Sequence, residues 1–160
     1  MKKVFVAIGA LGLGYGLYQY YTTQASILYR YKYEVVGVTI KKVSLKEVEL
    51  QIDVEVINNS SISATLTNYY FDIILNGERV AVIKNASVDQ FLEKNGGVSY
   101  LPMKVVIDPA KFVKGNVLTG LLESVKNSTI EQTGYFGFKK GLIRINKIPY
   151  SYTYKVKDFI

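Results

Sequence analysis

The chain has 160 residues, a formal net charge of +7 and no Cys, His or Trp. The lack of Cys excludes disulfides, thiol nucleophiles and Cys-ligated metal sites, and the lack of His excludes the Ser-His-Asp triad and most zinc and iron sites. Catalysis would have to use paired carboxylates, a Ser–Lys pair or an oxygen-bound metal, so we expect no enzymatic activity and no cofactor.

An uncharged, largely apolar run extends from Val4 to Tyr21, directly after Lys2 and Lys3. As a helix it would be roughly 27 Å long, close to the ~30 Å of a bilayer's hydrocarbon core. Residues 1–33 are therefore predicted to form a single-pass membrane anchor. A secretory signal cleaved near Thr23 and Ala25 is the alternative, but the apolar run is long for a signal and ends in aromatic residues. The residues expected inside the bilayer are Val4, Phe5, Val6, Ile8, Leu11, Leu13 and Leu17.

Small residues and tyrosines add detail to this segment. Gly12 and Gly16 have the small-xxx-small spacing that lets membrane helices approach closely, so they are candidates for helix packing and for self-association through the anchor. An ordinary small-residue anchor is the simpler interpretation of the same spacing. Tyrosine prefers the membrane–water interface, because its ring is buried there while its hydroxyl stays hydrated. The tyrosines expected at that interface are Tyr18, Tyr20, Tyr21, Tyr29 and Tyr31.

The positive charge is concentrated around the predicted anchor. Lys2, Lys3, Arg30 and Lys32 have no acidic residue among them, so residues 34–160 are only mildly basic. That balance argues against a nucleic-acid-binding domain, whereas the flanking charges suit anionic lipid headgroups. Residues 34–160 are numerous enough to form one domain with a substantial core.

Residues 34–160 are predicted to be mainly β. From Glu47 to Val56, apolar and acidic residues alternate, which is typical of a half-buried strand. A strand over Glu34–Val43 precedes it. Strands over Leu66–Leu75 and Arg79–Ile83 follow, joined by Asn76-Gly77, a strong hairpin signal. Further strands are predicted over Val98–Ile107, over Leu142–Ile148 and from Tyr150 onward.

One helix interrupts these strands. Asp108 can cap it and Pro109 can occupy its first position, and apolar residues then recur at helical spacing from Phe112 to Val125. Two glycines within that stretch predict that the helix is split or kinked. The expected fold is thus an antiparallel immunoglobulin-like β-sandwich with one late α-helix, preceded by an N-terminal transmembrane helix.

The order of elements resembles the late-embryogenesis-abundant type 2 family, also called the water-stress and hypersensitive-response domain. The stretches that carry the resemblance are VEVINNSS, TNYYFDIILNGERVAVI, the Gly96-Gly97 entry to the next strand, and INKIPYSYTYKV. The family usually shows Asn-Pro-Asn after the early strand, whereas this chain has Asn58-Asn59-Ser60 without a proline. The resemblance implies an immunoglobulin-like sandwich, often membrane-anchored, with no catalytic residues.

Two clusters of charged residues are candidate sites. Glu47, Glu49, Asp53 and Glu55 share one strand face and offer oxygen ligands for a cation such as Ca²⁺. Calcium usually takes its ligands from a turning loop, so we favour a solvated face that pairs with lysines such as Lys41 and Lys42. No metal is expected.

The second cluster follows Tyr135, Phe136 and Phe138. Aromatic residues beside cations can contact bases and phosphates, but lipid headgroups or an acidic protein are favoured over nucleic acid. A core strand followed by a solvated turn is the simplest interpretation. The candidate contacts for an anionic surface are Lys139, Lys140, Arg144 and Lys147.

Together these patterns predict a non-enzymatic, membrane-anchored β-sandwich with a structural or binding role at a bilayer surface, in a bacterial envelope. The alternative is a structural protein of a membrane-containing bacteriophage virion, where the chain would tether the capsid shell to an internal membrane. Expected partners are the lipid bilayer and a protein at the membrane surface, which in the alternative is a capsid protein. Copy number and location distinguish the two hypotheses.

Overall fold

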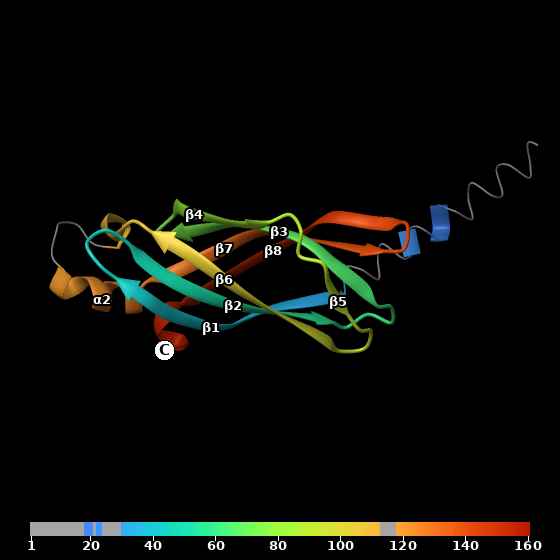
Figure 1. The fold of residues 1–160 in the computed structure, drawn as a ribbon, viewed down its shortest axis with the longest axis horizontal. Helices are drawn as coiled ribbons and strands as arrows, with labels where there is room; N and C mark the ends of the chain where they lie inside the picture. Colours follow the sequence, from blue (N-terminus) through green and yellow to red (C-terminus); the bar gives the residue numbers. More distant parts are fainter. Residues whose placement is uncertain (1–17, 21, 24–29, 113–117) are drawn as a thin grey trace, which may run out of the picture.

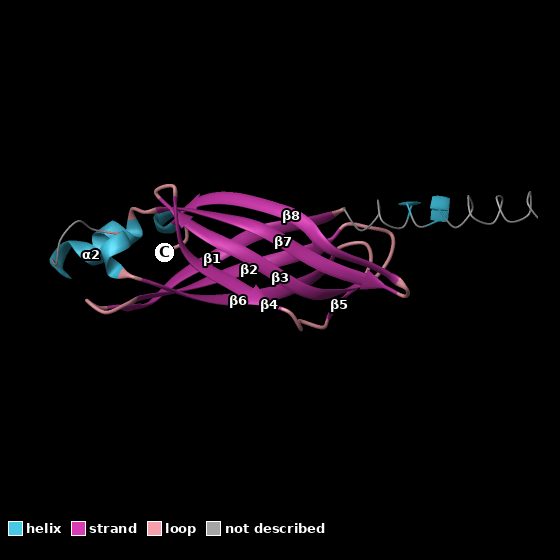
Figure 2. Cartoon of the chain, turned by 90° about the horizontal axis from the view of Figure 1, so that it is seen from above, coloured by secondary structure: helices cyan, strands magenta, loops and turns pink. Residues whose placement is uncertain are grey.

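A computed structural model describes residues 18–20, 22–23, 30–112 and 118–160 of the chain. From residue 30 onward the described part is mainly β and forms two antiparallel sheets that pack against each other as a sandwich (Figures 1 and 2). The three-stranded sheet has the order β1-β2-β6, and the five-stranded sheet has the order β4-β3-β7-β8 with β5 paired to β3. The strands are β1 Tyr31–Val43, β2 Val48–Asn58, β3 Ala64–Leu75, β4 Glu78–Asn85, β5 Gln90–Leu92, β6 Gly97–Ile107, β7 Thr129–Lys140 and β8 Ile143–Lys155.

The core lies between the facing sides of the two sheets. Strand β2 shows why it forms, because every second residue from Val48 to Val56 has no exposed surface while its neighbours are partly exposed. This confirms the alternation predicted for that segment. Strand β3, which was predicted over Leu66–Leu75, adds Phe71, Ile73 and Leu75 from the opposite sheet.

The register of the ladders assigns each turn to one end of the sandwich. Tyr31 pairs with Asn58, Asn58 with Gly97, and Thr65 with Lys139. The start of β1, the end of β2 and the β7–β8 connection therefore share one end, which we call the entry end. The β1–β2 and β3–β4 turns lie at the other end together with helix α2 (Leu118–Lys126), and we call this the helix end (Figure 1).

Asn76-Gly77 joins β3 and β4 as predicted. Both residues have positive φ, 53° for Asn76 and 80° for Gly77, which is the geometry of a type I′ turn. The turn leaves Leu75 paired with Glu78. The hairpin prediction is therefore confirmed.

The strand predictions need correction at β5, β7 and β8. The region from Thr129 was not predicted as a strand, yet β7 is the central partner of both β3 and β8. Strand β8 was predicted as two strands separated by Pro149, but it continues through the proline, which lies opposite Tyr135. The proline is tolerated because β8 is an edge strand and needs no partner on its outer side. The short strand β5 was not predicted.

The helix prediction is confirmed in part. Asp108 accepts a hydrogen bond from the Ala110 backbone N–H at 2.9 Å and caps a short 3₁₀ turn, η1 (Pro109–Lys111). Helix α2 is a separate element whose Leu121 and Val125 face the core. Residues 113–117 lie outside the described part of the chain.

Most of the predicted anchor lies outside the described residues, including all seven residues expected inside the bilayer and both Gly12 and Gly16. In the part of the chain that the structure describes, we find no helix with the length and apolar character needed to cross a membrane. Tyr18 and Tyr20 are described; both are helical and well exposed. Tyr21 and Tyr29 fall outside the described residues.

Candidate functional site

The β7–β8 hairpin brings the four predicted basic residues to the entry end. Lys139 pairs with Arg144 and Lys140 with Ile143, which leaves Gly141-Leu142 as a two-residue turn. Gly141 has a φ of 57°. Glycine at the first position of such a turn is typical of type II′ hairpins. We call residues 139–147 the basic hairpin.

No described residue neutralises the charges of the basic hairpin through an ion pair. Lys139, Lys140, Arg144 and Lys147 are exposed, and none of them forms an ion pair with another described residue. The sequence from Gln132 to Lys157 contains no acidic residue. The nearest defined partner is aromatic, since Lys147 Nζ lies 5.4 Å from the centroid of the Tyr135 ring. The hairpin is therefore a local concentration of positive charge.

Leu142 was predicted to begin a strand, but it lies at the tip of the basic hairpin. Its side chain is completely exposed, at 106% of the reference area, whereas the adjacent Ile143 is buried. Scattered exposed leucines are common on protein surfaces. This one is notable because cations surround it on both strands.

Tyr31 was predicted to lie at the membrane interface, and the structure corrects this. Its side chain is only 7% exposed, and its ring centroid lies 4.2 Å from that of Phe138. Two residues along β1, Tyr33 stacks on Phe136 at 4.3 Å with nearly parallel rings. Tyr31 is thus a core residue, and it packs the start of β1 against Phe138, the residue that directly precedes the basic hairpin.

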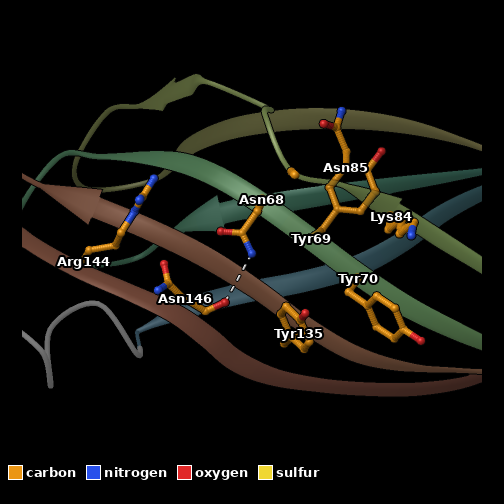
Figure 3. Close-up of a pocket in the computed structure, with 9 residues that line it drawn as sticks. Asn68, Tyr69, Tyr70, Lys84, Asn85, Tyr135, Arg144 and Asn146 are labelled. Carbon is orange, nitrogen blue, oxygen red and sulfur yellow. Dashed lines mark hydrogen bonds between the residues drawn. The ribbon is translucent and has the colours of Figure 1, made fainter.

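A polar hollow lies beside the basic hairpin on the outer face of the five-stranded sheet (Figure 3). Its volume is about 630 Å³, which falls within the range of ligand-binding clefts. In Figure 3, Arg144 and Lys84 lie at opposite ends of the hollow, with Asn68 between them. The lining residues are Asn68, Tyr69, Tyr70, Lys84, Asn85, Ala86, Tyr135, Arg144 and Asn146.

The hollow forms where the sheet is irregular. The β3–β7 ladder shifts register between Leu66 and Asn68, and the β7–β8 ladder shifts between Phe136 and Phe138. The Asn68 side chain donates a hydrogen bond across β7 to the backbone oxygen of Asn146 at 3.3 Å (Figure 3). Irregular ladders of this kind often occur next to functional sites because they redirect side chains.

A pair of aromatic rings forms one side of the hollow. The Tyr70 and Tyr135 rings stack with centroids 5.5 Å apart. The Tyr70 hydroxyl donates to Asp72 Oδ1 at 3.2 Å. Desolvation, and then this hydrogen bond, raises the pKa of Tyr70 above its usual value. Amides, hydroxyls and two cations, with no carboxylate in the lining, suit an anionic group that also carries hydroxyls.

The structure separates the three aromatic residues that precede the basic hairpin. Phe136 and Phe138 have no exposed surface and belong to the core. Only Tyr135 faces outward, beside Lys147. The hairpin therefore has one accessible ring rather than the row of rings that stacks on successive bases.

The acidic face of β2 forms ion pairs and hydrogen bonds with its neighbours. Glu47 lies 2.6 Å from Lys42, and Glu49 lies 2.8 Å from Lys104. Asp53 accepts a hydrogen bond from Gln51 at 2.8 Å. Within the described residues, no group of His, Cys, Asp or Glu is arranged to hold a metal ion. Pairing of Lys42 with this face agrees with the solvated-face interpretation.

Comparisons with known proteins give a likeness of fold. No family model matches the chain, and no curated protein matches its sequence. The solution structure of a protein provisionally named a late embryogenesis abundant (LEA) protein aligns with a TM-score of 0.50 and 16% identity, over 89% of this chain and 82% of that one. The X-ray structure of a Northeast Structural Genomics Consortium target aligns with a TM-score of 0.55 and 13% identity, over 81% and 89%.

A crystal structure of a protein from Archaeoglobus fulgidus is also similar, with a TM-score of 0.48 and 13% identity over 78% of this chain and 97% of that one. The sequence resemblance and the structural comparison thus agree on one point. The chain has a mainly β, sandwich-like fold similar to that of a LEA-type protein.

Proposed function

We propose that the chain is a non-enzymatic, membrane-anchored β-sandwich of the immunoglobulin-like type, which presents its basic entry end to an anionic bilayer. One observation carries this proposal. Tyr31, the first residue of β1, packs against Phe138 at the base of the basic hairpin. This contact supports the proposal because the chain enters the domain, from the side of the predicted anchor, at the end that carries the basic hairpin.

Chain length keeps this end close to the bilayer. Roughly ten residues separate the end of the apolar run at Tyr21 from Tyr31, and they span at most about 35 Å even when fully extended. Because Tyr31 is held in the core, the hairpin moves with the start of β1. The helix end lies roughly 40 Å farther away, since β1 has 13 residues.

Electrostatics favours this orientation. A basic residue close to an anionic membrane surface contributes about 1 kcal/mol, and the attraction fades within a Debye length of about 8 Å. The basic hairpin contributes this attraction only when the entry end faces the headgroups, since that end carries Lys139, Lys140, Arg144 and Lys147. The adjacent hollow shares Arg144 with the hairpin and offers amides that suit headgroup hydroxyls.

With the entry end on the membrane, the helix end faces away from it. That end is free to contact a protein partner, in a bacterial envelope or, in the alternative setting, beneath the capsid shell of a virion. The fold likeness to a LEA-type protein supports a binding or structural role without assigning a ligand.

Anchoring is tested by Leu11→Arg combined with Leu13→Arg in the full chain. Each charge costs about 2.5–3.5 kcal/mol at the centre of a membrane helix, so the variant should leave the membrane during an alkaline wash while the parent stays. The same positions changed to Ala provide the control, which should stay. An Arg variant that remains in the washed membranes contradicts the spanning anchor.

The orientation is tested by acetylating lysines of the full chain in vesicles of phosphatidylcholine and phosphatidylglycerol. Lys139, Lys140 and Lys147 should react several-fold more slowly than in phosphatidylcholine alone. Lys155, exposed at the far end of β8, should react equally in both and serves as an internal control. Equal protection of Lys155 and the hairpin lysines contradicts the proposed orientation.

A further inference from the structure

We propose that Leu142, at the tip of the basic hairpin, inserts among the acyl chains of the bilayer and gives the sandwich a second membrane contact beside its predicted anchor. The inference rests on the proposed function, because it requires the entry end to face the membrane. It adds a hydrophobic contact to the electrostatic one and names the residue that makes it.

The geometry of the turn presents this side chain to the outside. Gly141 takes the positive φ that the two-residue turn requires, so Leu142 occupies its second position. The next residue, Ile143, turns inward and is 7% exposed, whereas Leu142 is completely exposed. Leu142 contributes little to the core, and its side chain is available for an external apolar environment.

The charge pattern around Leu142 identifies that environment as an anionic membrane. Lys139 and Lys140 precede it and Arg144 follows it, and the structure gives none of the three a carboxylate partner among the described residues. An apolar tip within a basic collar is the arrangement of interfacial membrane anchors, where the cations remain with the headgroups while the apolar side chain enters the acyl region. An acidic protein surface would pair with the cations but would leave the leucine without an apolar environment.

The chain carries its own matched comparison at the opposite end. Leu45 lies in the β1–β2 turn, is 62% exposed and also has lysines nearby. There, however, Lys42 is paired with Glu47 at 2.6 Å. Leu45 thus resembles Leu142 in residue type and turn position, but it lies at the helix end, and one of its neighbouring lysines is paired with a carboxylate.

Because the chain has no cysteine, a single introduced cysteine can be labelled specifically. Leu142→Cys and Leu45→Cys each introduce a single thiol for an environment-sensitive fluorophore. The full chain is reconstituted in vesicles with equal amounts of phosphatidylcholine and phosphatidylglycerol. At position 142 the emission should shift to the blue, iodide in the water should quench it several-fold less than at position 45, and nitroxides on the acyl chains should quench it more.

The outcomes separate this inference from the proposed function. Vesicles that retain the chain after an alkaline wash, but show the same emission and quenching at both positions, would overturn the insertion of Leu142 and leave the anchor intact. A chain that does not float with the vesicles overturns the proposed function, and the inference with it.

An unlabelled variant checks that the fluorophore does not create the contact. Leu142→Asn leaves the core intact because the leucine is fully exposed. In chains that also carry Leu11→Arg and Leu13→Arg, binding to the same vesicles should fall several-fold with Leu142→Asn and stay unchanged with Leu45→Asn. Equal binding by these two variants would overturn the inference.

Discussion

Asn68 and Gly137 face each other across the β3–β7 ladder, and a Cβ atom on Gly137 would lie 2.0 Å from the Asn68 Oδ1 atom. No carbon can occupy that position while Asn68 stays in place. Asn68 is held from both sides, since its oxygen accepts from Thr67 Oγ1 at 2.8 Å and its nitrogen donates to the Asn146 oxygen. Glycine at position 137 is thus a condition for the polar hollow.

Gly137→Ala should lower the free energy of unfolding by about 1–3 kcal/mol, the usual cost of overpacking, because the new methyl group displaces Asn68. Urea denaturation of the full chain measures this. Gly120→Ala is the matched control: Gly120 lies in helix α2 with nothing within 4 Å of the added carbon, so alanine should be neutral or stabilise by up to about 1 kcal/mol. Equal stability of the two variants would contradict the close approach at Gly137.

The side chain of Asn58 is expected to stabilise the fold, although the sequence around it indicates only a polar turn. It is fully buried, donates to the backbone oxygen of Ile62 at 2.9 Å, and accepts from the Ser60 N–H at 2.9 Å. Asn58→Ala leaves these groups unpaired and should cost about 2–3 kcal/mol of stability. Asn59→Ala, at an exposed neighbour, should change stability by less than about 0.5 kcal/mol. Thermal unfolding compares the pair, and similar melting temperatures would refute the role of Asn58.

Asn76-Gly77→Ala-Ala should destabilise the β3–β4 hairpin. Both positions have positive φ, where a Cβ atom costs roughly 1–2 kcal/mol, and asparagine and glycine tolerate that region better than alanine. We expect a loss of about 1–3 kcal/mol in the free energy of unfolding. Ser61→Ala, in an exposed turn residue at the entry end, provides the control for a loop substitution. An unchanged melting temperature in the double variant would contradict the type I′ turn.

Buried tyrosines should make the domain sensitive to alkali. Burial raises the pKa of Tyr31 to about 12, and burial also raises the pKa of Tyr154 well above its usual value. The folded state therefore keeps these protons while the unfolded state loses them above pH 10. Above pH 10 the unfolded state therefore binds fewer protons than the folded state. The free energy of unfolding is unaffected by these tyrosines below pH 10 and falls as the pH rises above it, by about 1.4 kcal/mol per pH unit for each such tyrosine.

Tyr154→Phe should reduce that alkaline slope, as measured by urea denaturation between pH 9 and pH 11. The Tyr154 hydroxyl is buried without a hydrogen-bond partner among the described residues, so its removal should also stabilise the domain by about 1 kcal/mol at pH 7. Tyr152→Phe removes an exposed hydroxyl and should leave stability at pH 7 unchanged. A slope identical in Tyr154→Phe and the parent would show that Tyr154 ionises alike in both states.

The elements that the sequence predicts correctly are those whose cause is local. Strand β2 alternates because one face is buried and the other is solvated, and nothing interrupts its period. The Asn76-Gly77 turn and the Asp108 cap depend on backbone preferences of the residues themselves. Each of these signals can be recognised without knowledge of the rest of the fold.

Strand β7 escaped prediction because its burial does not alternate. Phe136, Gly137 and Phe138 are consecutive and all buried, since the ladder on each side of β7 shifts register near this point. An irregularity of this kind removes the period on which strand prediction depends. Pro149 caused the opposite error, since the sequence predicted a break at the proline whereas β8 continues through it. Only the sheet order shows that β8 is an edge strand.

The candidate site was predicted in part. The four basic residues were identified from their composition and do lie together, because the hairpin folds Lys139 opposite Arg144. Tyr31 was misassigned, since a tyrosine-rich stretch next to a predicted anchor is typical of an interfacial belt, and only its contact with Phe138 reveals a core residue. The hollow depends on residues from four strands, β3, β4, β7 and β8, and no single stretch of sequence contains it.

The antiparallel order of the sheets also determines how the domain would respond to a pulling force. A load applied between Tyr31 and Val156 acts at opposite ends of the sandwich, along β1 and β8. Hydrogen bonds in antiparallel ladders run perpendicular to the strands, so such a load shears many of them at once rather than opening them one by one. A sandwich loaded in this direction should therefore resist mechanical unfolding.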